Sequence, residues 1–123
     1  MSWLKAALGY AASAYVKDVL ARPEQMARAA RMYCQQVGKP LLNVGAGTPS
    51  SSLRAFVIGP TLWGDVNIDI AAPRIPHGPG HVSYGDARDL REWPDGHFGA
   101  VIARHVLEHL DRPDLALAEW KRV

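Results

Sequence analysis

The stretch "PLLNVGAG", residues 40–47, decides the fold. It joins a short apolar run to two glycines, the pattern of a buried strand that ends in a tight turn. Three more short, strand-like runs follow at "GDVNIDI" (64–70), "HVSYGD" (81–86) and "FGAVIAR" (98–104). Short apolar strands that alternate with helices are typical of a parallel sheet covered on both faces. We therefore expect an α/β fold built on a doubly wound, Rossmann-like parallel sheet.

Four helices are predicted around these strands. Apolar residues recur every three to four positions over residues 3–20, and a second helix over 23–37 has proline in its first turn and glycine just past its last turn. A short helix is expected over 48–59. The last one lies within 111–123, where we expect Asp111 to cap the helix, Pro113 to occupy its first turn, and Leu115, Ala118 and Trp120 to share one face.

Length and composition limit the possible classes of protein. The chain has 123 residues, of which 48% are hydrophobic and 21% charged, the balance of a globular protein with one small core. We expect residues 1–40 to form a helical cap on a domain formed by 41–123. The formal net charge of +2 gives no strong nucleic-acid signal. The single cysteine, Cys34, excludes an intrachain disulfide and suits a cytoplasmic location.

No transmembrane segment is expected at the N-terminus. Lys17 and Asp18 interrupt the weakly apolar run there, which leaves it shorter than the roughly 20 apolar residues that a membrane span needs. A packing helix, a helix on a membrane surface and a signal peptide remain alternatives for this segment.

The glycine loop and one acidic residue together predict a cofactor site. Asp69 ends the second strand 22 residues after Gly47, the spacing at which a carboxylate accepts hydrogen bonds from a ribose. A structural turn and a strand-end aspartate are the alternative. A dinucleotide fingerprint would place a third glycine at the position of Ser50, to bring a helix N-terminus to the pyrophosphate. S-adenosylmethionine has no pyrophosphate, so the pattern favours it over NAD.

The run "RHVLEHL", residues 104–110, offers a competing interpretation. It contains H-x-x-E-H, the order found in inverted zinc peptidases, with His105 and His109 as ligands and Glu108 as base. A catalytic zinc site also needs a third protein ligand. Only 14 residues follow His109, and Glu119 is the one glutamate among them. We therefore predict no metal site.

Residues 84–123, "YGDARDLREWPDGHFGAVIARHVLEHLDRPDLALAEWKRV", resemble class I S-adenosylmethionine-dependent methyltransferases, in particular the type 11-like domains. Members of this family commonly show G-D-A-x-x-L, an aspartate-containing turn, an apolar strand and then H-V-L-E-H-L. "LLNVGAG" matches the first motif of the family with Asn43 where aspartate is usual, and "NIDI" resembles the second motif. The resemblance covers about residues 41–123.

The resemblance implies a role for individual residues. Asn43, Gly45, Ala46 and Gly47 would border the methionine part of S-adenosylmethionine, and Asp69 would hold the ribose. Ile70 would pack against the adenine. Asp86 and Ala87 would meet the adenine edge, with Asp86 accepting a hydrogen bond from the exocyclic amine. Arg104 and His105 would follow the fourth strand near the methyl group, and His105 is the candidate catalytic base.

The function implied is methyl transfer from S-adenosylmethionine to an acceptor that the sequence does not identify, a small molecule or a glycan or lipid. A cofactor-binding or interaction module without catalysis is the alternative, and an NAD-dependent oxidoreductase is a weaker one. The family sheet has seven strands in the order 3-2-1-4-5-7-6, of which this chain can supply strands 3-2-1-4. We therefore expect the N-terminal, cofactor-binding part of a longer enzyme, which could self-associate through its exposed fourth strand.

Overall fold

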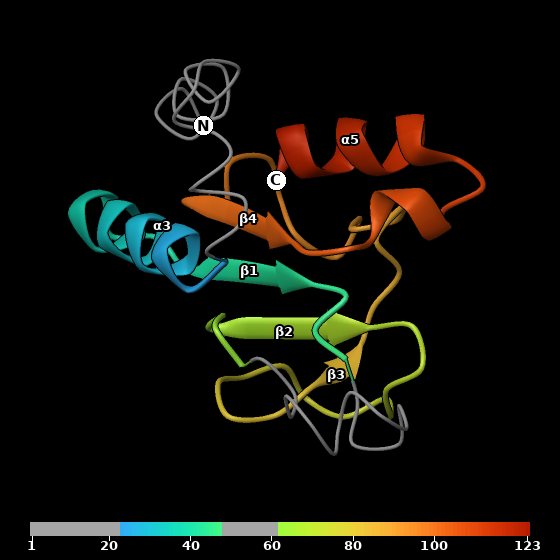
Figure 1. The fold of residues 1–123 in the computed structure, drawn as a ribbon, viewed down its shortest axis with the longest axis horizontal. Helices are drawn as coiled ribbons and strands as arrows, with labels where there is room; N and C mark the ends of the chain where they lie inside the picture. Colours follow the sequence, from blue (N-terminus) through green and yellow to red (C-terminus); the bar gives the residue numbers. More distant parts are fainter. Residues whose placement is uncertain (1–22, 48–61) are drawn as a thin grey trace.

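A computed structural model describes residues 23–47 and 62–123 of the chain (Figure 1). The predicted helices over residues 3–20 and 48–59 lie outside these ranges. The elements in chain order are α3 (Pro23–Val37), β1 (Leu41–Val44), β2 (Val66–Asp69), β3 (Ser83–Tyr84), β4 (Ala100–Ala103), the 3-10 turn η1 (Leu107–His109) and α5 (Pro113–Arg122).

The four strands form one parallel sheet in the order β3-β2-β1-β4, which confirms the predicted order. In the register of this sheet, Val44 at the end of β1 is paired with Ile68 of β2 and with Ala103 of β4. The carboxyl ends of these strands therefore lie at one edge of the sheet. In parallel α/β sheets this edge is where ligands bind.

The sheet lies between α3 and α5, and its alternating side chains build two cores (Figure 1). Leu42 and Val44 of β1 belong to the core that contains Trp120 of α5. Leu41 belongs to the core that contains Cys34 of α3. Because successive side chains of a strand point to opposite faces, the continuous apolar run of β1 supplies both cores.

Helix α3 has the bounds predicted from the sequence. Its buried residues Ala27, Ala30 and Cys34 are three and four positions apart, so they form one face against the sheet. Gly38 follows the helix with φ of +65°, and the Lys39 N–H donates to the carbonyl of Cys34 at 3.0 Å. Burial raises the pKa of the Cys34 thiol, which here serves as a small packing residue.

Two details predicted for the last helix are wrong. Pro113 does begin α5, but Arg112 is its N-cap and gives no side-chain cap, because the Asp111 carboxylate pairs with Arg88 instead. The buried residues of the helix are Ala116 and Trp120, whereas Leu115 and Ala118 are exposed. The Trp120 indole fixes which face of the helix is buried, because its Nε1–H donates to the carbonyl of Ala87 at 2.9 Å.

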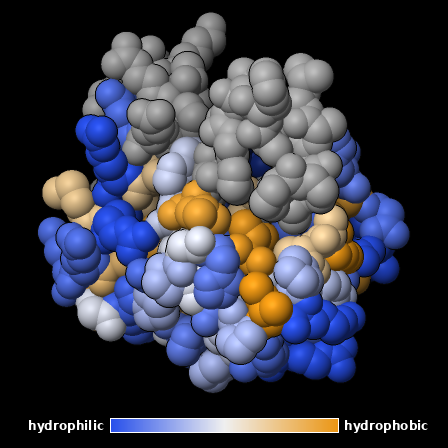
Figure 2. Space-filling view, turned by 90° about the horizontal axis from the view of Figure 1, so that it is seen from below, coloured by the Kyte–Doolittle hydropathy of each residue, from blue (hydrophilic) through white to orange (hydrophobic). Residues whose placement is uncertain are grey.

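No helix in the described ranges is both long enough and apolar enough to cross a membrane. Figure 2 shows a short apolar strip in the middle of the face seen from below Figure 1, with mostly hydrophilic side chains around it.

Candidate functional site

The glycine loop turns the chain sharply at the end of β1. Gly45 and Gly47 have φ of +65° and +85°, left-handed values that glycine adopts without a steric penalty. Between them, the N–H of the buried Ala46 donates to the carbonyl of Ile68 at 3.0 Å. The loop is therefore attached to the end of β2, and its glycines present bare backbone at the carboxyl edge of the sheet.

Asp69 holds this loop by its carboxylate. Its Oδ2 accepts the N–H of Gly47 at 3.1 Å, and its Oδ1 accepts the N–H of Ala71 at 2.9 Å. An ionised carboxylate has about four lone-pair sites, so each oxygen keeps the capacity to accept another hydrogen bond. The next residue, Ile70, has 60% of its surface exposed. A hydrogen-bond acceptor and an exposed apolar side chain thus stand side by side at the end of β2.

Asp86 and Ala87 follow β3 in the same way. The Asp86 carboxylate accepts the backbone N–H of Arg88 at 2.9 Å and two guanidinium N–H groups of that residue at 3.2 Å. These hydrogen bonds and the positive charge of Arg88 lower the pKa of Asp86 below its ordinary value, so the side chain is ionised at neutral pH. The preceding Gly85 donates its N–H to the Asp69 carbonyl at 3.3 Å, which links the ends of β2 and β3.

A cavity of about 520 Å³ lies at this edge of the sheet. This volume is within the range of small-molecule sites. It brings together most of the residues that the sequence predicted for cofactor binding, together with the candidate base. These residues are Gly45, Asp69, Ile70, Asp86, Ala87 and His105.

His105 is the only described non-glycine residue with a positive φ. Its φ is +54°, a sparsely populated value for a residue with a Cβ, which recurs at functional sites. The turn places the exposed imidazole at the cavity wall directly after β4 and Arg104. Its Nδ1 lies 3.5 Å from Oε1 of Glu108, so the carboxylate can orient the ring.

The H-x-x-E-H run does not have the geometry of a metal-binding helix. Only Leu107–His109 are helical, as one 3-10 turn, and His105 precedes it in a left-handed conformation. His109 and His105 both lie near Oε1 of Glu108, at 3.8 Å and 3.5 Å, and all three side chains are exposed. Over residues 23–47 and 62–123, no three His, Cys, Asp or Glu side chains are grouped to hold a metal ion.

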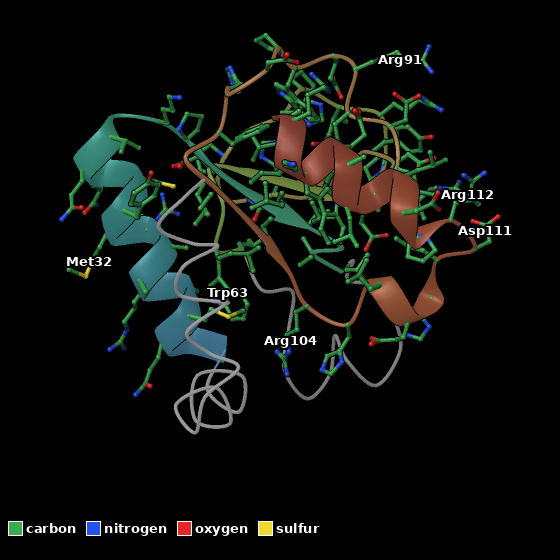
Figure 3. The ribbon with its side chains drawn as sticks, turned by 90° about the horizontal axis from the view of Figure 1, so that it is seen from above. Met32, Trp63, Arg91, Arg104, Asp111 and Arg112 are labelled. Atoms are coloured by element: carbon green, nitrogen blue, oxygen red, sulfur yellow. The ribbon has the colours of Figure 1, made fainter. Side chains whose placement is uncertain are left out.

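Four predicted residues do not line this cavity. Asn43 is buried within the sheet, and its Nδ2 donates to Oδ1 of Asn67 at 3.1 Å. Ala46 is buried beneath the glycine loop, and Gly47 meets the site through its N–H bond to Asp69. Figure 3 shows Arg104 well apart from Asp111, one of the residues that line the cavity.

The cavity also contains residues that were not predicted from the sequence: Val44, Gly85, Arg88, Val106, His109, Leu110 and Asp111. Leu107 is 39% exposed, whereas its neighbours Val106 and Leu110 pack against the core. Arg88 was recognisable from its spacing, because Asp86-x-Arg88 places an acid and a base two residues apart in a turn. The other contributions depend on contacts between distant segments.

A group of hydrogen-bonded polar side chains, His77, Ser83 and Glu92, lies away from this cavity, at β3. His77 Nδ1 is 2.6 Å from Ser83 Oγ, and His77 Nε2 is 3.2 Å from the Glu92 carboxylate. The arrangement has the residue types of a hydrolytic triad. Ser83 is fully buried and also contacts the carbonyl of Asn67, so its hydroxyl is closed to a substrate. We assign these three residues a structural role, because they fix the proline-rich loop between β2 and β3, residues 71–80, to the sheet.

The family model described as "Methyltransferase domain" matches residues 42–123, two thirds of the chain. The chain belongs to the methyltransferase domain family. Comparison with curated proteins and with solved structures found no significant match. The match begins in β1 and extends through α5, so the glycine loop, the carboxyl ends of all four strands and the cavity of this methyltransferase domain lie within it.

Proposed function

We propose that this methyltransferase domain binds S-adenosylmethionine in the cavity at the carboxyl ends of its strands and supplies the cofactor-binding half of a methyl-transfer site. The observation that carries the proposal is the placement of the Asp69 carboxylate. Its carboxylate fixes the glycine loop through Gly47 and still offers acceptors at the cavity wall, beside the exposed Ile70. This combination fits a ribose and an adenine. The cavity volume of about 520 Å³ suits a ligand of this size.

The bound cofactor supplies an activated methyl group, so the domain has mainly to position the reactants. Gly45 lines the loop side of the cavity, Asp69 would hold the ribose hydroxyls, and Asp86 would accept a hydrogen bond from the adenine amine. His105 lies at the same cavity with Glu108 behind its Nδ1. Its free Nε2 could accept a proton from an acceptor hydroxyl or amine. Small molecules, glycans and lipids remain the proposed acceptor classes, in a cytoplasmic setting.

Calorimetric titration with S-adenosylhomocysteine and its 2′,3′-dideoxy analogue tests the assignment of Asp69. Asp69→Ala also removes the Gly47 contact, so a simple loss of affinity would not distinguish the ribose from the loop. Comparing both ligands on both proteins separates the two effects. A hydrogen bond to a charged group contributes about 1.5–3 kcal/mol, so loss of the hydroxyls should weaken binding to the native domain about ten-fold or more.

The same ligand change should have little effect on Asp69→Ala, because the acceptor is already gone. If both proteins lose affinity equally when the hydroxyls are removed, Asp69 does not contact the ribose. NAD serves as the competitor that represents the oxidoreductase alternative. Displacement of S-adenosylhomocysteine by NAD at similar concentration would contradict the cofactor assignment.

We further propose that two copies can pair through β4. Among the described strands, β4 is an edge of the sheet. The Gly99 N–H donates to the Pro40 carbonyl at 2.9 Å, so by alternation the peptide groups of Ala100 and Ile102 point away from β1. An open edge with an apolar sequence is a template for another strand. Light scattering at increasing concentration should show association, and a monodisperse monomer throughout would contradict it.

A further inference from the structure

Arg88 connects two distant segments at the mouth of the cavity. Its guanidinium donates to both carboxylate oxygens of Asp86, at 3.2 Å each, and its Nη1 donates to Oδ1 of Asp111. Asp86 follows β3, whereas Asp111 precedes α5, and all three residues line the cavity. Arg88 therefore lies beside Asp86, the carboxylate that is proposed to meet the adenine edge. Its hydrogen bonds join the two segments that form this wall of the cavity.

These contacts determine what Asp86 can recognise. Oδ1 accepts two hydrogen bonds, from the backbone N–H and the Nε of Arg88, and Oδ2 accepts one, from Nη2. An ionised carboxylate has about four lone-pair sites and no proton to donate. One acceptor site on Oδ2 is thus left, in an orientation fixed by the planar guanidinium. A ligand group that meets it must donate a hydrogen bond.

We propose that Arg88 is a positioning residue that fixes Asp86 and thereby makes the site selective for a 6-aminopurine over a 6-oxopurine. The exocyclic amine of adenine donates a hydrogen bond, whereas the 6-oxo group of hypoxanthine presents an oxygen that the carboxylate repels. The inference rests on the proposed function, because it takes the adenine edge to lie at Asp86. Arg88 also lowers the pKa of Asp86, which keeps the acceptor ionised.

The chain contains a matched control for this residue. Arg91 pairs with Asp89 across the same two-residue spacing, at 2.8 Å, and removing it changes the net charge by the same amount. Its side chain is 87% exposed, and it does not line the cavity. A general effect of charge on ligand binding should therefore appear equally in Arg88→Ala and Arg91→Ala. An effect through Asp86 should appear in Arg88→Ala alone.

The test is calorimetric titration of the native chain and its variants with S-adenosylhomocysteine and with S-inosylhomocysteine, its 6-oxo analogue. The native chain and Arg91→Ala should prefer the 6-amino ligand by about ten-fold or more, the range of a hydrogen bond to a charged group. Arg88→Ala should lose most of that preference, and Arg88→Lys should keep part of it, because lysine restores the charge without the planar fork. An unchanged ratio of affinities in Arg88→Ala overturns the proposal.

Failure of this inference can be told apart from failure of the proposed function. If the native chain binds neither ligand, the cofactor assignment is wrong and the role of Arg88 in selectivity fails with it. If it binds both with equal affinity, the cavity binds the ligand, but Asp86 does not distinguish the 6-amino group from the 6-oxo group, and the proposed selectivity is wrong. NMR titration of the Asp86 carboxyl gives a readout without ligand. Its pKa should rise in Arg88→Ala and stay unchanged in Arg91→Ala, and an equal pKa in all three proteins overturns the positioning role.

Discussion

Replacing Gly45 with alanine tests how closely the glycine loop packs against the segment after β4. Gly45 has φ of +65°, and a Cβ built there would lie less than 3.0 Å from Cγ2 of Val106. The left-handed conformation alone costs about 1–2 kcal/mol for a residue with a Cβ. Overpacking adds about 1–3 kcal/mol. We therefore expect Gly45→Ala to lower the free energy of unfolding by about 2–5 kcal/mol.

Gly38 provides the control, because it has the same φ of +65° but no described atom within 4 Å of the position that a Cβ would occupy. Gly38→Ala should therefore cost only the backbone term of about 1–2 kcal/mol. Urea unfolding followed by tryptophan fluorescence measures both variants. The excess of Gly45→Ala over Gly38→Ala isolates the clash with Val106.

A second substitution identifies the atom responsible. Val106→Ala removes Cγ2, so in the Gly45→Ala background it should recover part of the excess, with a coupling of about 0.5–3 kcal/mol in a double-mutant cycle. The reasoning is refuted if Gly45→Ala is no more destabilising than Gly38→Ala. It is also refuted if the excess persists unchanged without the valine methyl groups.

Two further predictions concern buried and acidic groups away from the cavity. Asn67→Ala should lower the free energy of unfolding by about 3 kcal/mol. The reason is that the Asn67 side-chain amide pairs with both the N–H and the carbonyl of the buried Gly64, each at 2.9 Å. A loss under about 1 kcal/mol in urea unfolding would contradict this. Hydrogen bonding from Arg122 lowers the pKa of Glu119, which also accepts the Leu90 N–H at 2.6 Å. A depressed folded-state pKa stabilises the fold above the ordinary value of about 4.5 and ceases to do so as the pH falls through the folded value. Glu119→Gln should therefore be less stable than the native chain at pH 7 and close to it in strong acid, and an equal difference at both pH values would count against the ion pair.

The sheet was predictable because its strands are buried on both faces. The apolar runs at β1, β2 and β4 can be read from local sequence, and continuous apolar strands of this kind are typical of a parallel sheet. The glycine loop and the position of Asp69 were predictable for a similar reason, because the loop follows one apolar run and Asp69 lies near the end of the next.

The errors arose where distant segments compete for a side chain. Asp111 has the sequence context of a helix cap, but Arg88, 23 residues earlier, pairs with it in space. The "LALA" run of α5 offers more than one apolar stripe, and the contact of Trp120 with Ala87 selects the one that is buried. The contact of His77 with Ser83 crosses a proline-rich loop whose path no periodic pattern describes. Tertiary contacts decide such cases, and local sequence does not contain them.

The most direct test of the central claim is to map S-adenosylhomocysteine binding on the backbone amides by two-dimensional NMR. The account predicts that titration shifts the amide signals of Gly47, Ile70 and Ala87, which lie at the ends of three strands. The signals of Gly38 and Gly96, which do not line the cavity, should stay in place. Shifts confined to α3, or no shifts at all in the presence of excess ligand, would contradict a cofactor site at the carboxyl edge of this sheet.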